Sequence, residues 1–113
     1  MSVQKIEFND ANFDAETREG LSVVCFEDPR DMECRKESAL VEKAASAIAE
    51  QIKLGNCDIE NCPALAERFR VTSIPTILII KDGNEVERLT GFRHEKALIK
   101  HLKKHVGEDL QDL

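Results

Sequence analysis

Residues 26–36, FEDPRDMECRK, join a run of apolar residues to the start of a long helical pattern. The run before them, LSVVCF at residues 21–26, is nearly all apolar and rich in β-branched residues. This is typical of a strand that is buried on both faces of a sheet. After the stretch, apolar residues recur at helical spacing as far as about residue 52. The pattern therefore predicts a buried strand that leads through a polar turn into a long helix.

A second stretch, SIPT at residues 73–76, precedes the most clearly marked strand of the chain. That strand, TILII at residues 76–80, is apolar and rich in β-branched residues. The residues KDGN at 81–84 are typical of a turn, and residues 85–89 follow as a partner strand. We therefore expect an antiparallel hairpin here.

The remaining segments complete an alternating pattern of strands and helices. We expect strands at residues 3–8 and 53–59, and helices at residues 9–19, 32–52, 63–69 and 95–106. Asn9 or Asp10 is expected to start the first helix, and Pro63 suits the first turn of the third. The order β-α-β-α-β-α-β-β-α combines crossover units with a final hairpin. It predicts an α/β domain over residues 1–107, with a five-stranded mixed sheet and helices on both faces. Residues 108–113 are expected to form a frayed acidic tail.

Composition narrows the class of protein. The chain has 113 residues, of which 42% are hydrophobic and 34% charged, as in ordinary soluble globular domains. A net charge of −6 argues against nucleic acid and against an acidic partner. Neither a signal peptide nor a membrane span is evident, so we expect a cytoplasmic protein, monomeric by default. We also expect no cofactor and no metal, with the four cysteines as thiols.

The two motifs resemble the thioredoxin family. In that family the first stretch reads FWAPWCGPCK, so Asp31 matches the attacking cysteine and Cys34 the resolving one. The segments NCPALAERF at residues 61–69 and KDG at 81–83 also look like the corresponding family segments. The resemblance covers nearly the whole chain and implies a thioredoxin-like fold.

The resemblance implies a site that has lost its nucleophile. Family members with both cysteines reduce disulfides, because a thiolate at a helix N-terminus attacks and a second thiol resolves the mixed disulfide. Asp31 can do neither, and we interpret it as a cap of the following helix, or alternatively as a carboxylate that contacts a partner. Cys25 matches a buried acid of the family. Cys25 and Cys34 are either two buried thiols or an internal pair.

The step from Ile74 to Pro75 implies a docking surface. In the family the matching proline is cis, and the residue before it pairs with an extended peptide of the partner. With it we group Arg30, Met32 and Gly91 as residues that contact the partner. Arg30 replaces a family tryptophan. It lies beside Glu27, Asp28, Asp31 and Glu33, a charged rim that either selects a polar partner or is simply a solvated face.

Two further groups of residues leave alternatives open. Cys57 and Cys62 are expected at the carboxyl end of the sheet, where they either hold a disulfide or stay as thiols. His101 and His105 lie among lysines, so we expect a solvated helix face there rather than a ligand pair.

The sequence therefore predicts an atypical thioredoxin-family protein related to cell redox homeostasis. We expect a noncatalytic module that binds a protein or peptide segment, without ordinary dithiol disulfide reductase activity. The alternative is a thiol-disulfide oxidoreductase that uses Cys34 with Cys25 or with an external thiol.

Overall fold

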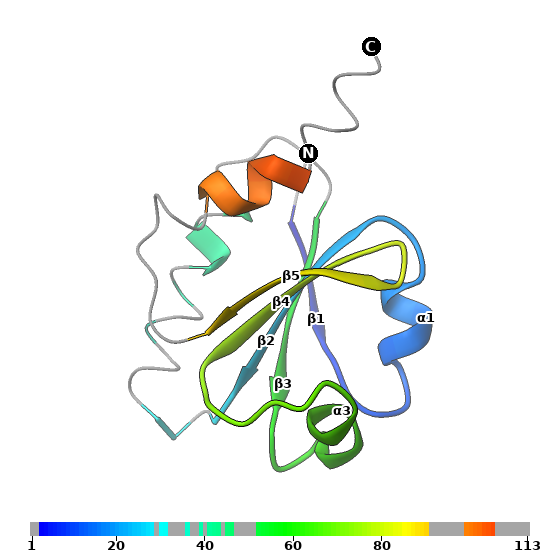
Figure 1. Ribbon diagram of the computed structural model, residues 1–113, viewed down its shortest axis with the longest axis vertical. Coiled ribbons are helices and arrows are strands. Elements are labelled where there is room, and N and C mark those ends of the chain that lie inside the picture. The colour runs from blue at the N-terminus through cyan, green and yellow to red at the C-terminus, as the bar shows by residue number, and fades with distance from the viewer. Residues whose placement is uncertain are drawn as a thin grey trace.

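The computed structural model describes residues 3–28, 30–31, 36, 39, 41–43, 45–46, 52–90 and 99–105. Its strands form one five-stranded sheet in the order β1-β3-β2-β4-β5 (Figure 1). β1 (Val3–Glu7), β3 (Ile52–Asp58) and β2 (Leu21–Glu27) are parallel to one another. β4 (Thr76–Lys81) is antiparallel to β2, and β5 (Asn84–Thr90) is antiparallel to β4. The predicted mixed sheet is confirmed.

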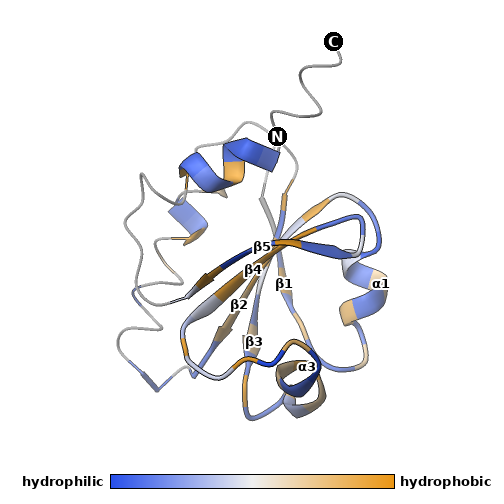
Figure 2. Ribbon diagram, in the orientation of Figure 1, coloured by the Kyte–Doolittle hydropathy of each residue, from blue (hydrophilic) through white to orange (hydrophobic). Residues whose placement is uncertain are grey.

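The two strands with the longest apolar runs, β2 and β4, occupy inner positions of the sheet. Val24, Cys25, Phe26 and Leu78 have no exposed surface. Figure 2 shows the hydrophobic colours gathered along these strands. Both faces of β2 and β4 are covered, which explains why neither sequence alternates between apolar and polar residues.

The core lies in two layers, one on each face of the sheet. On one face, helices α1 (Phe13–Thr17) and α3 (Pro63–Arg68) pack over a cluster that contains Phe8 and Phe26. On the other face, helical residues 41–43, 45–46 and 99–105 contribute Val41, Ala45 and Leu102 to a second cluster. Figure 1 shows these helical segments on opposite sides of the strands, which confirms helices on both faces.

The first helix is shorter than predicted. It begins at Phe13 rather than at residue 9, because the Asn9 side chain accepts hydrogen bonds from the backbone N–H groups of Ala11 and Asn12 (both 2.8 Å) and forms a local turn. Asp10 does not start this helix either. Its carboxylate accepts hydrogen bonds from two backbone N–H groups of α3, with Oδ1 3.1 Å from the Leu65 nitrogen.

The second helix ends before residue 52, contrary to the prediction. Ile52 is the first residue of β3, where it pairs with Val3 and Leu21 on the two neighbouring strands. Apolar periodicity continues by chance across the boundary, and long-range pairing decides the structure. Within the described part of this segment, Val41 and Ala45 are buried as the helical spacing indicates.

The hairpin and the third helix agree with the prediction. Asp82 and Gly83 have φ values of 49° and 86°, the left-handed conformation that a tight turn requires. The β4–β5 register shifts between Ile79 and Ile80. α3 begins at Pro63 as expected. Residue 107 and the tail 108–113 lie outside the described residues.

The predicted solvated helix face at His101 and His105 is wrong for His105. His105 is buried, with 9% of its surface exposed, so it does not lie on a solvated face. Its Nε2 lies 3.0 Å from Oε1 of Glu87 on β5, and His101 Nδ1 lies 3.1 Å from Oε2. The hydrogen bond from His105, and secondarily the charges of Lys104 and His101, lower the pKa of Glu87. Within the described residues, no helix has the length and apolar character needed to cross a bilayer.

Candidate functional site

The turn after β2 and the loop before β4 lie at the same end of the sheet. Phe26 pairs with Thr76, the last pair of the antiparallel ladder between these strands. The chain therefore leaves β2 toward Asp31 beside the point where it enters β4 through Ile74 and Pro75. The two motifs that the sequence singled out are brought together.

The turn after β2 is organised by Asp28. Its carboxylate accepts hydrogen bonds from Arg30 Nε and NH2, both at 2.9 Å, and Oδ1 also accepts one from the Arg30 backbone N–H at 3.0 Å. These bonds, the side-chain ones first, lower the pKa of Asp28. The N–H of Asp31 donates to the Asp28 carbonyl oxygen at 2.9 Å, and Asp31 is exposed. Residues 32–35 lie outside the described residues, so the cap role of Asp31 stays a prediction.

Arg30 connects two loops that are distant in sequence. Besides Asp28, its guanidinium contacts Glu60, with NH2 2.6 Å from Oε2, in the loop between β3 and α3. Sequence reasoning missed Glu60, because no local pattern links residues thirty positions apart. Glu27, by contrast, is only 6% exposed and is not part of an exposed rim as predicted. The rim in the described residues consists of Asp28, Arg30, Asp31 and Glu60.

The loop before β4 contains the cis-proline that the family resemblance implies. The peptide bond between Ile74 and Pro75 is cis. Pro75 is buried, Ile74 is half-buried, and the Thr76 hydroxyl donates to the Ser73 carbonyl oxygen at 2.6 Å. Within the described residues, none of the backbone hydrogen bonds outside the helices and strands uses Ile74.

The remaining predicted site residues divide into one that is placed and three that are not. Cys25 is a thiol in the middle of β2, fully buried in the cluster that also contains Val41 and Ala45. It thus faces the helix that follows Asp31. Cys34, Met32 and Gly91 lie outside the described residues, so their predicted roles are not tested by the structure.

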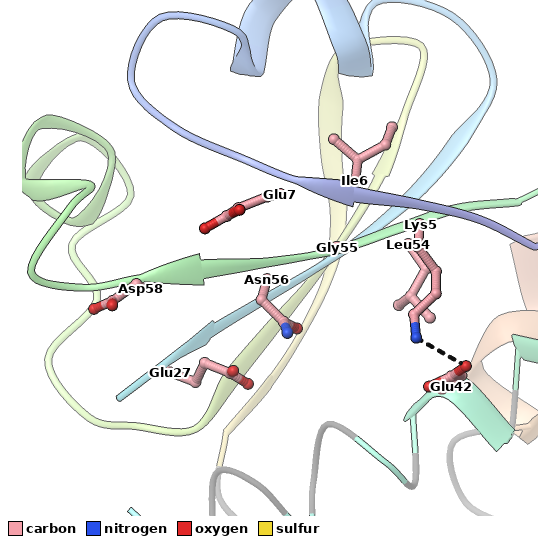
Figure 3. Close-up of a pocket in the computed structure, with 9 residues that line it drawn as sticks. All are labelled: Lys5, Ile6, Glu7, Glu27, Glu42, Leu54, Gly55, Asn56 and Asp58. Carbon is pink, nitrogen blue, oxygen red and sulfur yellow. Dashed lines mark ion pairs between the residues drawn. The ribbon is translucent and has the colours of Figure 1, made fainter. Parts of the chain in front are cut away.

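A cavity of about 400 Å³ opens at the carboxyl ends of the three parallel strands. Figure 3 shows the side chains of Glu7, Glu27 and Asp58 around it, while Lys5 pairs with Glu42 at 3.1 Å. Carboxylates thus outnumber the one lysine, and the cavity suits a positively charged group better than an anion. It is lined by Lys5, Ile6, Glu7, Glu27, Glu42, Leu54, Gly55, Asn56 and Asp58.

Sequence reasoning missed this cavity, although a signal exists. Each of the three parallel strands ends on an acidic residue, and such ends meet at one edge of a sheet. Among the described residues, no three histidine, cysteine or acidic side chains are placed to share a metal ion.

Cys57 and Cys62 lie on the opposite face of the sheet from Cys25. Both are thiols with no exposed surface. They belong to the cluster around Phe8, and the pKa of each thiol is affected by the other. Of the two alternatives that the sequence left open for Cys57 and Cys62, a disulfide or two thiols, the structure has two thiols.

A sheet in this strand order, with a turn after β2 beside a cis-proline loop, defines a thioredoxin-like domain. A family model described as Thioredoxin matches residues 4–104 of the chain. Thioredoxin of Bacillus subtilis (strain 168) is 31% identical over 101 residues, which cover 89% of this chain and 97% of that protein. Thioredoxin of Listeria monocytogenes is 35% identical over 100 residues, which cover 88% and 97%.

A solved structure of a mutant thioredoxin from Halobacterium salinarum NRC-1 aligns with a TM-score of 0.76 at 20% identity. The alignment covers 91% of this chain and 89% of that one, and at this identity it shows the fold alone. The family model and the relatives show more. This chain belongs to the thioredoxin family, and its membership supports a redox-related function.

Proposed function

We propose that this protein is a noncatalytic member of the thioredoxin family that holds an extended protein or peptide segment. The observation that carries the proposal is Asp31, an exposed carboxylate residue at the position that the family resemblance assigns to the attacking cysteine. A carboxylate cannot attack a disulfide and form the mixed disulfide with which exchange begins. The ordinary cycle therefore has no first step in this chain.

The docking surface rests on the loop before β4. Ile74 is half-buried and its peptide groups are not used by the described backbone hydrogen bonds outside the helices and strands. An extended segment would pair with these groups as an added strand does, and backbone bonds of this kind supply affinity without demanding a particular sequence. Met32 and Gly91 are proposed to contact the same segment, as the family resemblance implies.

The rim next to this loop would select the partner. Arg30, held by Asp28 and Glu60, presents a charged group where the family has a flat apolar tryptophan. A segment that meets such a surface is polar, and its association weakens as salt screens the charges. The site of action would be the cytoplasm, whose reducing environment keeps buried thiols reduced.

The first test measures the reduction of insulin's disulfides by dithiothreitol with and without the protein. We expect the wild-type protein to leave the rate unchanged, whereas Asp31→Cys, which restores the spacing of two cysteines, accelerates it. Cys34→Ser serves as the matched control and should behave as the wild type. Wild-type turnover that disappears in Cys34→Ser would instead identify an oxidoreductase that uses Cys34 with Cys25 or with an external thiol.

The second test measures binding. Extended peptides selected from a displayed library are titrated into the isotopically labelled protein, and amide shifts are mapped by NMR. We expect shifts at residues 73–76 and at Arg30 and Asp31. Ile74→Ala should weaken binding about tenfold by removing apolar contact. Val86→Ala, at a 40% exposed apolar residue of β5, is the matched control and should not change the affinity. Shifts confined to β5 or β1 would contradict the proposed surface.

A further inference from the structure

A second pair of sulfur atoms lies away from the family's active-site position. Cys57 is in β3 and Cys62 precedes the first residue of α3, and neither thiol has exposed surface. The Cys62 thiol donates a hydrogen bond to the Phe8 carbonyl oxygen at 3.3 Å, and Cys57 is buried in the same core cluster as Cys62. Only five positions separate the two residues along the chain, and both lie in one cluster, which is the proximity that a disulfide requires.

The backbone holds the two residues in this arrangement. After β3 the chain turns tightly, and the N–H groups of Asn61 and Cys62 both donate to the Asp58 carbonyl oxygen, at 2.8 and 3.0 Å. The Phe8 N–H donates to the Asn56 carbonyl oxygen at 3.0 Å, which fixes Phe8 beside the end of β3. Backbone hydrogen bonds therefore hold the loop from Cys57 to Cys62, both within the loop and between the end of β3 and Phe8.

A cavity lies next to the loop that carries the two cysteines. A cavity of about 350 Å³ is lined by Glu7, Phe8, Asn9, Asp58 and Asn61. Asp58 and Asn61 are the chain neighbours of the two cysteines, and Phe8 carries the carbonyl group that binds the Cys62 thiol. The cavity is thus lined by residues next to both cysteines, and a local opening of this loop would be enough to admit a small solute.

We propose that Cys57 and Cys62 form a redox pair that a peroxide converts to an internal disulfide. Cys62 loses its proton, and the thiolate attacks hydrogen peroxide and breaks its O–O bond. The sulfur becomes a sulfenic acid, and the leaving hydroxide takes up the released proton and departs as water. The Cys57 sulfur then attacks the Cys62 sulfur, forms the S–S bond and releases a second water. Two thiols and one peroxide give one disulfide and two waters, and neither Asp31 nor Cys34 takes part.

The surroundings make this reaction slow. Burial raises the pKa of both thiols, and the carboxylates of Asp10, Asp58 and Glu7 raise that of Cys62 further. The interaction with Cys57, by contrast, lowers the pKa of Cys62, which favours Cys62 as the attacking sulfur. Because the thiolate is the reactive form, the rate should rise about tenfold per pH unit below the thiol pKa.

The test is peptide mapping of the full-length protein after exposure to hydrogen peroxide. Remaining thiols are alkylated under denaturing conditions, and the chain is then cut with trypsin. Cleavage after Lys53 and Arg68 places both cysteines in one peptide, residues 54–68, while Cys25 and Cys34 fall in two others. We expect the 54–68 peptide two hydrogens lighter and unalkylated. Alkylation of both its cysteines, or a link between the other two peptides, would overturn the proposal.

Variants identify the order of the two steps. In Cys57→Ser the sulfenic acid on Cys62 has no resolving thiol, so dimedone should label Cys62 after peroxide treatment. In Cys62→Ser we expect no labelling of Cys57. Cys34→Ser is the matched control and should still give the light 54–68 peptide. Loss of that peptide in Cys34→Ser would show that the pair depends on the family position and would refute an independent redox pair.

Discussion

Gly55 is the residue of β3 at which a single methyl group should cost the most stability. A Cβ atom built at this position would collide with the Ile6 carbonyl oxygen and would lie 2.6 Å from Cε2 and 2.7 Å from Cδ2 of the Phe8 ring. Neither neighbour can move freely. Ile6 belongs to β1, and Phe8 is buried with its ring 5.7 Å from that of Phe13.

The expected cost follows from what must shift. Inserting a methyl group into a packed core costs about 1–3 kcal/mol, and here relief requires displacement of a strand backbone. We therefore expect Gly55→Ala to lower the free energy of unfolding by about 3 kcal/mol.

Gly83→Ala is the matched control. Gly83 has a φ of 86° and no atom within 4 Å of a built Cβ. The free energy of unfolding of this variant should therefore fall by only about 1 kcal/mol, because of the backbone conformation alone. The chain has no tryptophan or tyrosine, so urea unfolding is followed by far-ultraviolet circular dichroism. If Gly55→Ala lost no more stability than Gly83→Ala, the packing of β1 against β3 would be looser than described.

Three further predictions concern the charged and sulfur groups. Glu87→Gln should lower the free energy of unfolding by about 1–2 kcal/mol near neutral pH, since His105 loses its charged acceptor. Because the fold lowers the pKa of Glu87, its contribution is present above the ordinary value of 4.5 and is lost as pH falls through the lowered value. Urea titrations of the variant should therefore show a shallower loss of stability in acid, and an unchanged slope would contradict this. Arg30→Ala should leave folding stability unchanged and reduce the salt dependence of peptide binding, measured by titration at two ionic strengths. Oxidation of Cys57 and Cys62 should raise the free energy of unfolding by about 2 kcal/mol through the entropy of a short closed loop, and an equal urea midpoint with and without reductant would refute it.

The parts of the fold that the sequence predicts well are those set by local pattern. The apolar runs of β2 and β4 identify the inner strands, Pro63 marks the start of α3, and the residues around Gly83 mark the hairpin turn. Each signal lies within a few residues of the structure it specifies. The pairing of β2 with β4, which positions the site, follows from these elements and from the lengths of the segments that connect them.

The parts that the sequence does not predict depend on contacts between distant residues. Asp10 caps α3 rather than its own helix, with fifty-five positions between it and Leu65. Glu60 meets Arg30, and Glu87 meets His105, only after the sheet has formed. From the sequence alone, charged side chains such as these are predicted to be solvated, because their partners belong to other elements.

The candidate site divides in the same way. The adjacency of the turn after β2 and the loop before β4 follows from two motifs at matching ends of neighbouring strands, and the pairing of Phe26 with Thr76 shows it. The cavity edged by Glu7, Glu27 and Asp58 follows from three strand ends that only the sheet order brings together. Strand order is a property of the whole chain, which is why this second feature was missed.

The shift in register between Ile79 and Ile80 has a consequence for how the protein behaves when it is crowded. It distorts β5, an outermost strand, whose Arg88 is engaged by Glu85 at 2.8 Å and by the Phe69 carbonyl oxygen at 2.6 Å. A bulged border that carries charges is a poor template for another molecule's strand. Concentrated samples should consequently resist fibril growth along this side.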